Sequence, residues 1–141
     1  MLNSIDAMKQ TEPKIIPADI SVRKNCLILF SLYVLLLLWL EPIIDFFLTL
    51  APWDGSRQSL LALNEQKAMI TTKVFVVARS IPILIFLWLG YRVFQAQALP
   101  PKGMRLPITV LVIEGAKAKM LGATLMVIAL LLLLRELTLL V

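Results

Sequence analysis

Apolar residues gather in three long runs along the chain, at 26–50, 74–91 and 120–141. A helix rises about 1.5 Å per residue, so roughly 20 residues cross a hydrocarbon layer ~30 Å thick. The pattern therefore predicts three transmembrane helices over these ranges. The first run exceeds the ~7–15 apolar residues of a cleaved signal sequence, so we interpret it as a retained anchor.

Composition supports this interpretation and narrows the chemistry. The chain has 141 residues, of which 60% are hydrophobic and 16% charged, whereas soluble chains carry about 25% charged residues. A single cysteine, Cys26, excludes a disulfide scaffold, and the sequence contains no histidine, the commonest general base and metal ligand. We expect an all-α membrane protein that is not an enzyme and has no catalytic residues, cofactor or metal.

The segments between the runs predict the orientation in the membrane. The tail at 1–25 is mixed in sign, with Arg23 and Lys24 directly before the first run. The loop at 92–119 carries five basic residues against the single acid Glu114, whereas the loop at 51–73 carries mixed charge. Basic loops stay in the cytoplasm, so the N-terminus is expected inside and the C-terminus outside. The tail is expected to be loosely ordered with one docking segment, and the outer loop to contain an amphipathic helix. The net charge of +5 gives no sign of nucleic-acid binding, because no basic and aromatic face accompanies it.

Ionisable residues within the apolar runs are the candidate functional residues. Each costs roughly 2.5–3.5 kcal/mol at mid-membrane, so such residues tend to be paired. Counting from the cytoplasmic ends of the helices places Arg79 level with Glu41 and Arg135, and we expect Arg79 to pair with Glu41 or Asp45. Alternatively, the two acidic residues mark the outer end of the first helix and Arg135 extends to the interface. A proton relay is a further alternative. The complete set of intramembrane candidates is Glu41, Asp45, Arg79, Arg135 and Glu136.

Two prolines interrupt the first two runs. Pro42 cannot donate to the Leu38 carbonyl, and Pro82 leaves the Ala78 carbonyl without its usual donor. In lipid such carbonyls need other donors, and Arg79 or Ser80 lies near enough in sequence to supply one. Alternatively, Pro42 begins a separate short helix, because its fixed φ suits a first-turn position.

The loop at 92–119 combines a stiff turn with a β-branched stretch. Residues 106–113 are too short to span the membrane, and we expect a short cytoplasmic β element or a packing segment there. The turn contains the motif residues Pro100, Pro101, Gly103 and Arg105. At the start of the third helix, Ala118 and Gly122 have the spacing that permits close helix approach.

This part of the chain resembles a group of uncharacterised small inner-membrane proteins of proteobacteria. The resemblance covers residues 98–134. It rests on the sequence from Pro100 to Arg105, on Thr109-Val110-Leu111 and on the stretch from Gly115 to Lys119, which precedes a leucine-rich helix. The present loop has Lys102 where the group has a third proline. The resemblance implies a Gram-negative inner membrane and carries no known activity, so it transfers no functional residue.

Taken together, the sequence predicts a small integral membrane protein that acts as an accessory, scaffold or assembly subunit of a membrane complex. The expected partners are the lipid bilayer and either another membrane protein or a second copy of the chain. The alternative is an oligomeric small transporter or channel in which Glu41 and Asp45 face a wet interior.

Overall fold

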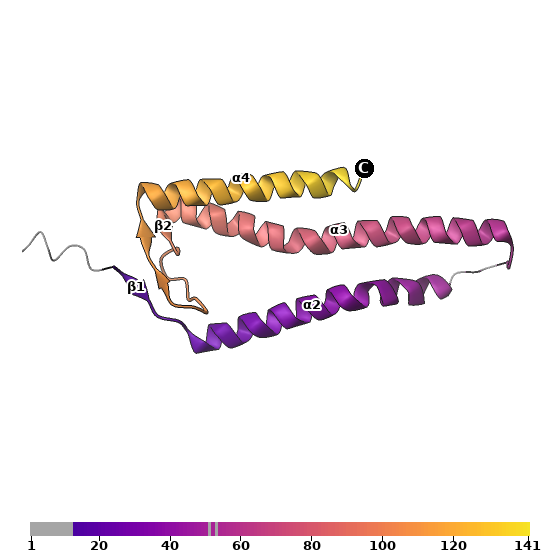
Figure 1. Ribbon diagram of the computed structural model, residues 1–141, viewed down its shortest axis with the longest axis horizontal. Coiled ribbons are helices and arrows are strands. Elements are labelled where there is room, and N and C mark those ends of the chain that lie inside the picture. The colour runs from indigo at the N-terminus through magenta and orange to yellow at the C-terminus, as the bar shows by residue number, and fades with distance from the viewer. Residues whose placement is uncertain (1–12, 51, 53) are drawn as a thin grey trace, which may run out of the picture.

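The computed structural model describes residues 13–50, 52 and 54–141, and within them the chain forms three long helices and four very short strands. The helices are α2 (Ile20–Thr49), α3 (Arg57–Ala96) and α4 (Ala116–Thr138). Each is long and apolar enough to cross a membrane. The strands β1 (Ile15–Ile16), β2 (Ala98–Leu99), β3 (Val110–Leu111) and β4 (Ile113–Glu114) gather at one end of the helices (Figure 1).

The helices extend further than the apolar runs that predicted them. α2 begins six residues before Cys26 because the Asp19 side chain caps it, accepting hydrogen bonds from the backbone N–H groups of Ser21 and Val22 at 2.9 and 3.4 Å. α3 contains both the expected amphipathic segment and the expected second span in one continuous helix, which begins at the N-cap Ser56 and ends where Gln97 adopts a left-handed conformation.

α3 and α4 form a tightly packed antiparallel hairpin. Gly90 and Gly122 face each other in it, and a Cβ on Gly122 would lie 2.7 Å from the Phe94 backbone nitrogen. Such a contact leaves no room for any side chain, so the two glycines set the distance between the helices. Val76 and Val93 of α3, together with Ala118 and Ala129 of α4, are buried along this contact.

α2 packs much less closely than the hairpin. It is separated from α3 near the strands and approaches it toward the opposite end, where α3 extends past the end of α4 (Figure 1). Ile44 is its single buried residue among those the structure describes. Both prolines lie inside continuous helices, so the alternative in which Pro42 begins a separate helix is wrong.

One pair of short strands joins the N-terminal segment to the loop between α3 and α4, and the other pair lies within that loop. β1 pairs with β3 and β2 pairs with β4, each pair antiparallel. The expected β element at 106–113 therefore exists as β3 and β4, the latter ending one residue further along. The expected docking segment of the tail corresponds to β1, whereas residues 1–12 of that tail lie outside the described part of the chain.

Candidate functional site

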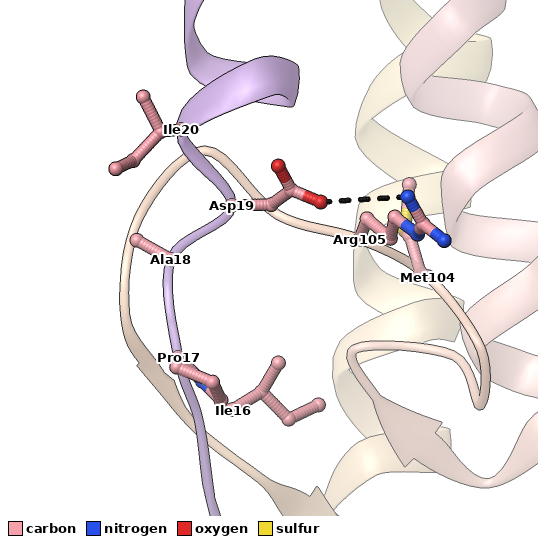
Figure 2. A pocket seen from close by; sticks show the side chains of 7 residues that line it. All are labelled: Ile16, Pro17, Ala18, Asp19, Ile20, Met104 and Arg105. Carbon is pink, nitrogen blue, oxygen red and sulfur yellow. Dashed lines mark ion pairs between the residues drawn. The ribbon is translucent and has the colours of Figure 1, made fainter.

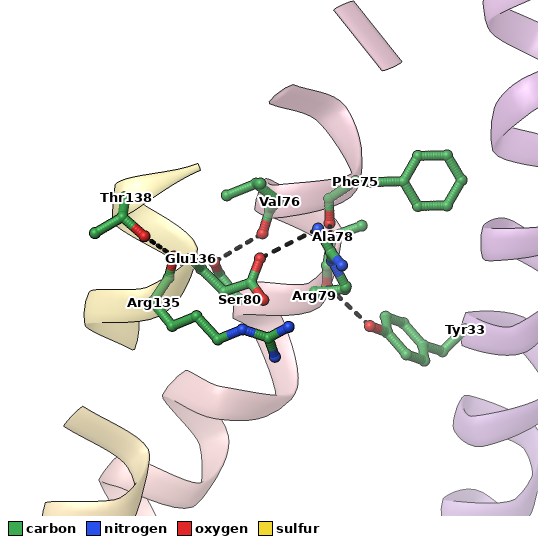
Figure 3. Close-up of polar contacts among 9 residues, drawn as sticks. All are labelled: Tyr33, Phe75, Val76, Ala78, Arg79, Ser80, Arg135, Glu136 and Thr138. Atoms are coloured by element: carbon green, nitrogen blue, oxygen red, sulfur yellow. Dashed lines mark hydrogen bonds and ion pairs between the residues drawn. The ribbon is translucent and has the colours of Figure 1, made fainter. Parts of the chain in front are cut away.

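A polar layer crosses the helices at the level of Tyr33, Ala78 and Glu136 (Figure 3). The Tyr33 hydroxyl on α2 donates a hydrogen bond of 2.8 Å to the Ala78 carbonyl on α3. This is the carbonyl that Pro82 leaves without an intrahelical donor. Arg79 and Ser80 were the candidate donors from the sequence, but the Ser80 hydroxyl donates to the Val76 carbonyl and the Arg79 Nε donates to the Phe75 carbonyl at 3.4 Å.

Arg79 forms an ion pair with Glu136 of α4, with 3.3 Å between Arg79 Nη2 and Glu136 Oε2. The Glu136 side chain is buried, whereas that of Arg79 is about half exposed. The carboxylate oxygen lacks an aligned hydrogen-bond donor within the described residues, so the attraction is mainly electrostatic. Removal of the cation from a pair with a buried carboxylate is destabilising, because the buried negative charge is then uncompensated.

The packing of α4 explains why Glu136 meets α3. Gly122, Ala129 and Glu136 recur every seven residues and are all buried, as expected for one stripe of a helix that packs along a neighbour. Val76 lies 14 residues before Gly90, and Glu136 lies 14 residues after Gly122. Because α3 and α4 are antiparallel and Gly90 faces Gly122, these equal separations place Val76 and Glu136 at one level. Arg79 lies one helical turn from Val76 and so comes beside Glu136.

The expected pairing of Arg79 with Glu41 or Asp45 is not what the structure shows. Asp45 Oδ1 lies 2.7 Å from Lys67 Nζ, in the N-terminal part of α3. The Tyr33–Ala78 bond sets the register: Asp45 is 12 residues beyond Tyr33, and Lys67 is 11 residues before Ala78. Both separations correspond to roughly 17 Å along a helix, so Asp45 lies a long way beyond the polar layer.

Glu41 and Arg135, the remaining candidates, are exposed. Neither forms an ion pair within the part of the chain that the structure describes. Arg135 lies beside Glu136 on α4 in the polar layer (Figure 3). The expectation that Arg135 joins Arg79 at one level therefore agrees with the structure, whereas Glu41 lies eight residues, about 12 Å, beyond Tyr33.

A second set of polar contacts fixes the N-terminal segment against the loop. Asp19 caps α2, its N–H donates to the Leu106 carbonyl at 2.8 Å, and its Oδ2 lies 3.6 Å from Arg105 Nη1 (Figure 2). Lys14 and Glu114 form an exposed pair at 3.6 Å. Asp19 and Arg105 also line a pocket of about 510 Å³ beside this segment. They hold the start of α2 to the loop that joins the other two helices.

The motif residues of the loop build the turn that presents Arg105. Pro100 and Pro101 are buried, and the Pro101 carbonyl accepts a hydrogen bond of 3.1 Å from the Met104 N–H. Gly103 has a φ of 80°, which favours glycine at this position. Arg105 then forms its ion pair with Asp19, the N-cap residue of α2.

Sequence reasoning missed Tyr33, Lys67 and Asp19. Each leaves a trace in the sequence. Tyr33 is a hydroxyl within an apolar run, Lys67 precedes the second run by seven residues, and Asp19 precedes a helix as N-cap residues do. None of these traces identifies a partner, because the partners lie on other helices.

The described residues contain no group of three or more histidine, cysteine, aspartate or glutamate side chains that could hold a metal ion. Within this part of the chain, the arrangement is suited to holding helices together through ion pairs and the hydrogen bond between Tyr33 and Ala78. No protein-family model, curated protein or solved structure matches the chain.

Proposed function

We propose that the chain is an integral protein of a bacterial inner membrane that serves as an accessory, scaffold or assembly subunit of a membrane complex. The apolar helices support the membrane location. The strand-bearing end of the bundle supports a cytoplasmic N-terminus, because it carries eight basic side chains and only two acidic ones in residues 13–24 and 92–119.

The observation that carries the proposed role is the unequal packing of the helices. α3 and α4 bury a continuous stripe against each other, and α2 has one buried residue, Ile44. α2 exposes large side chains around most of its circumference, including Phe30 and Trp39 at 65% and 59% exposure. A helix with so little packing in its own chain has surface left for a helix of another protein.

The test is affinity purification of the tagged full-length chain from native membranes in mild detergent. We expect one companion membrane protein at a fixed ratio, released by the double change Phe30→Ala and Trp39→Ala. The matched control is Val127→Ala with Leu131→Ala on the exposed face of α4, which should leave the companion bound. If the chain purifies alone, or both doubles behave alike, the accessory role is wrong.

The transporter alternative predicts a different result from the same preparation. It requires an oligomer of this chain alone and a pH-dependent flux in liposomes that Glu41→Gln abolishes. In the structure Asp45 is paired with Lys67, so a role for both acidic residues in a wet pathway requires that pair to open. Inert liposomes together with a stoichiometric companion support the accessory role.

A further inference from the structure

A pocket of about 220 Å³ lies where α3 ends and the loop begins, lined by Arg92, Gln95, Ala96, Pro101 and Lys102. Its two charged residues are both cations and come from different elements, Arg92 from α3 and Lys102 from the turn that follows β2. Neither forms an ion pair with any residue that the structure describes. The pocket is therefore a concave site with positive charge to neutralise.

The neighbouring side chains hold this pocket in place. The Arg92 guanidinium lies 5.2 Å from the centre of the Trp88 ring, within the range of a cation–π contact. Gln95 Nε2 donates to the Tyr91 hydroxyl at 2.6 Å. The turn that carries Lys102 is closed by the hydrogen bond from Met104 to Pro101. Both cations are thus attached to ordered backbone that lines the pocket.

The aromatic residues place the pocket at the depth of lipid headgroups. Trp88 and Tyr91 are about half exposed on α3, the first one turn before Arg92 and the second directly before it. Exposed tryptophan and tyrosine at the end of a spanning helix lie where the hydrocarbon meets the headgroups. A phosphate at this depth comes within reach of both Arg92 and Lys102.

We propose that this pocket binds the phosphate of an anionic phospholipid headgroup on the cytoplasmic side. Basic pockets beside spanning helices suit such headgroups, and a planar guanidinium and an ammonium in one pocket offer donors to several phosphate oxygens. The acyl chains lie along the exposed apolar surface of α3, on the membrane side of Trp88. This inference rests on the proposed membrane location and is independent of the accessory role.

The experiment measures lipid binding to the purified full-length chain in a neutral detergent. Native mass spectrometry counts bound phosphatidylglycerol against phosphatidylcholine, and thermal unfolding is followed with each lipid. We expect preferential retention of phosphatidylglycerol and a higher melting temperature with it. The double change Arg92→Gln with Lys102→Gln should weaken that binding roughly tenfold or more, because each Lys or Arg near an anionic lipid surface strengthens the binding severalfold.

The matched control removes the same charge from the same end of the bundle, with Lys24→Gln and Lys117→Gln, both exposed and outside the pocket. It should retain the lipid, and so should the charge-preserving double Arg92→Lys with Lys102→Arg. Equal losses in the pocket and control doubles would overturn the site in favour of diffuse attraction. Competition by inorganic phosphate as effective as by the lipid would overturn the assignment to a headgroup. Extraction of the chain without detergent would instead contradict the membrane location.

Discussion

The Tyr33 hydroxyl donates to the Ala78 carbonyl at 2.8 Å, and that carbonyl is the one that Pro82 deprives of its intrahelical donor. The proline in α3 and the tyrosine in α2 are therefore complementary. In the hydrocarbon core of a membrane no water can donate to the freed carbonyl, so its donor must come from the protein. This bond is the polar link between the loosely packed α2 and the hairpin at mid-height.

Tyr33→Phe should weaken the association of α2 with α3. Hydrogen bonds between membrane helices contribute about 0.5–1.5 kcal/mol, so a loss of that size in the free energy of unfolding is expected. Pro82→Ala restores an N–H for Ala78, and in that background Tyr33→Phe should have a smaller effect. Equal effects in the two backgrounds would show that the bond does not compensate for the proline. Reversible unfolding in mixed micelles provides the measurement.

Arg79→Leu should destabilise the α3–α4 hairpin because it leaves Glu136 buried without a cation. We expect a loss on the order of 2 kcal/mol or more. Adding Glu136→Leu should recover part of that loss, since no charge is then left in the apolar contact. Arg135→Leu is the control, because Arg135 is exposed and has no ion pair with a described residue. Additive effects of the two leucine substitutions in a double-mutant cycle would argue against the pair.

Gly122→Ala should separate the hairpin, because the added Cβ would lie 2.7 Å from the backbone of Phe94. Overpacking of this kind typically costs about 1–3 kcal/mol. Val127→Leu, which adds bulk on the exposed face of α4, should be close to neutral. Crosslinking between cysteines introduced on α3 and α4 would report the change in spacing. An unaltered crosslinking rate in Gly122→Ala would refute the close contact.

The turn before α3 should respond to acid in a defined range. Hydrogen bonds from Ser59 and Ser56 lower the pKa of Asp54 from 3.8 to about 2. Because the pKa of Asp54 is lower in the folded chain, ionised Asp54 stabilises the turn fully above pH ~4. This stabilisation is lost as the pH falls toward 2. The Ser56 amide, which donates to Asp54 at 2.9 Å, should shift in NMR spectra with that midpoint. Asp54→Asn should abolish the titration, and a midpoint near 4 would contradict the hydrogen-bonded turn.

The sequence predicts the helices well and the side-chain partners poorly. Runs of apolar residues determine which segments span, and the prolines identify which carbonyls need a donor. Partner choice depends on the register between helices. Counting residues from the expected cytoplasmic ends of the helices placed Glu41 level with Arg79. In the structure Tyr33 is the α2 residue at that level. The contact between Gly90 and Gly122 sets the register of α4 against α3. The sequence shows the α4 side of this contact as the Ala118 and Gly122 spacing, but no motif identifies Gly90 as the partner.

The central claim is that the chain crosses the membrane three times, with the N-terminal segment and the 97–115 loop on one side. Single cysteines test it most directly, introduced as Ser21→Cys, Lys102→Cys, Ser56→Cys or Val141→Cys in a Cys26→Ala background. A membrane-impermeant thiol reagent applied to intact cells should label the cysteines at 56 and 141 and reach those at 21 and 102 only after the inner membrane is opened. Labelling of 102 and 141 from the same side would contradict the account.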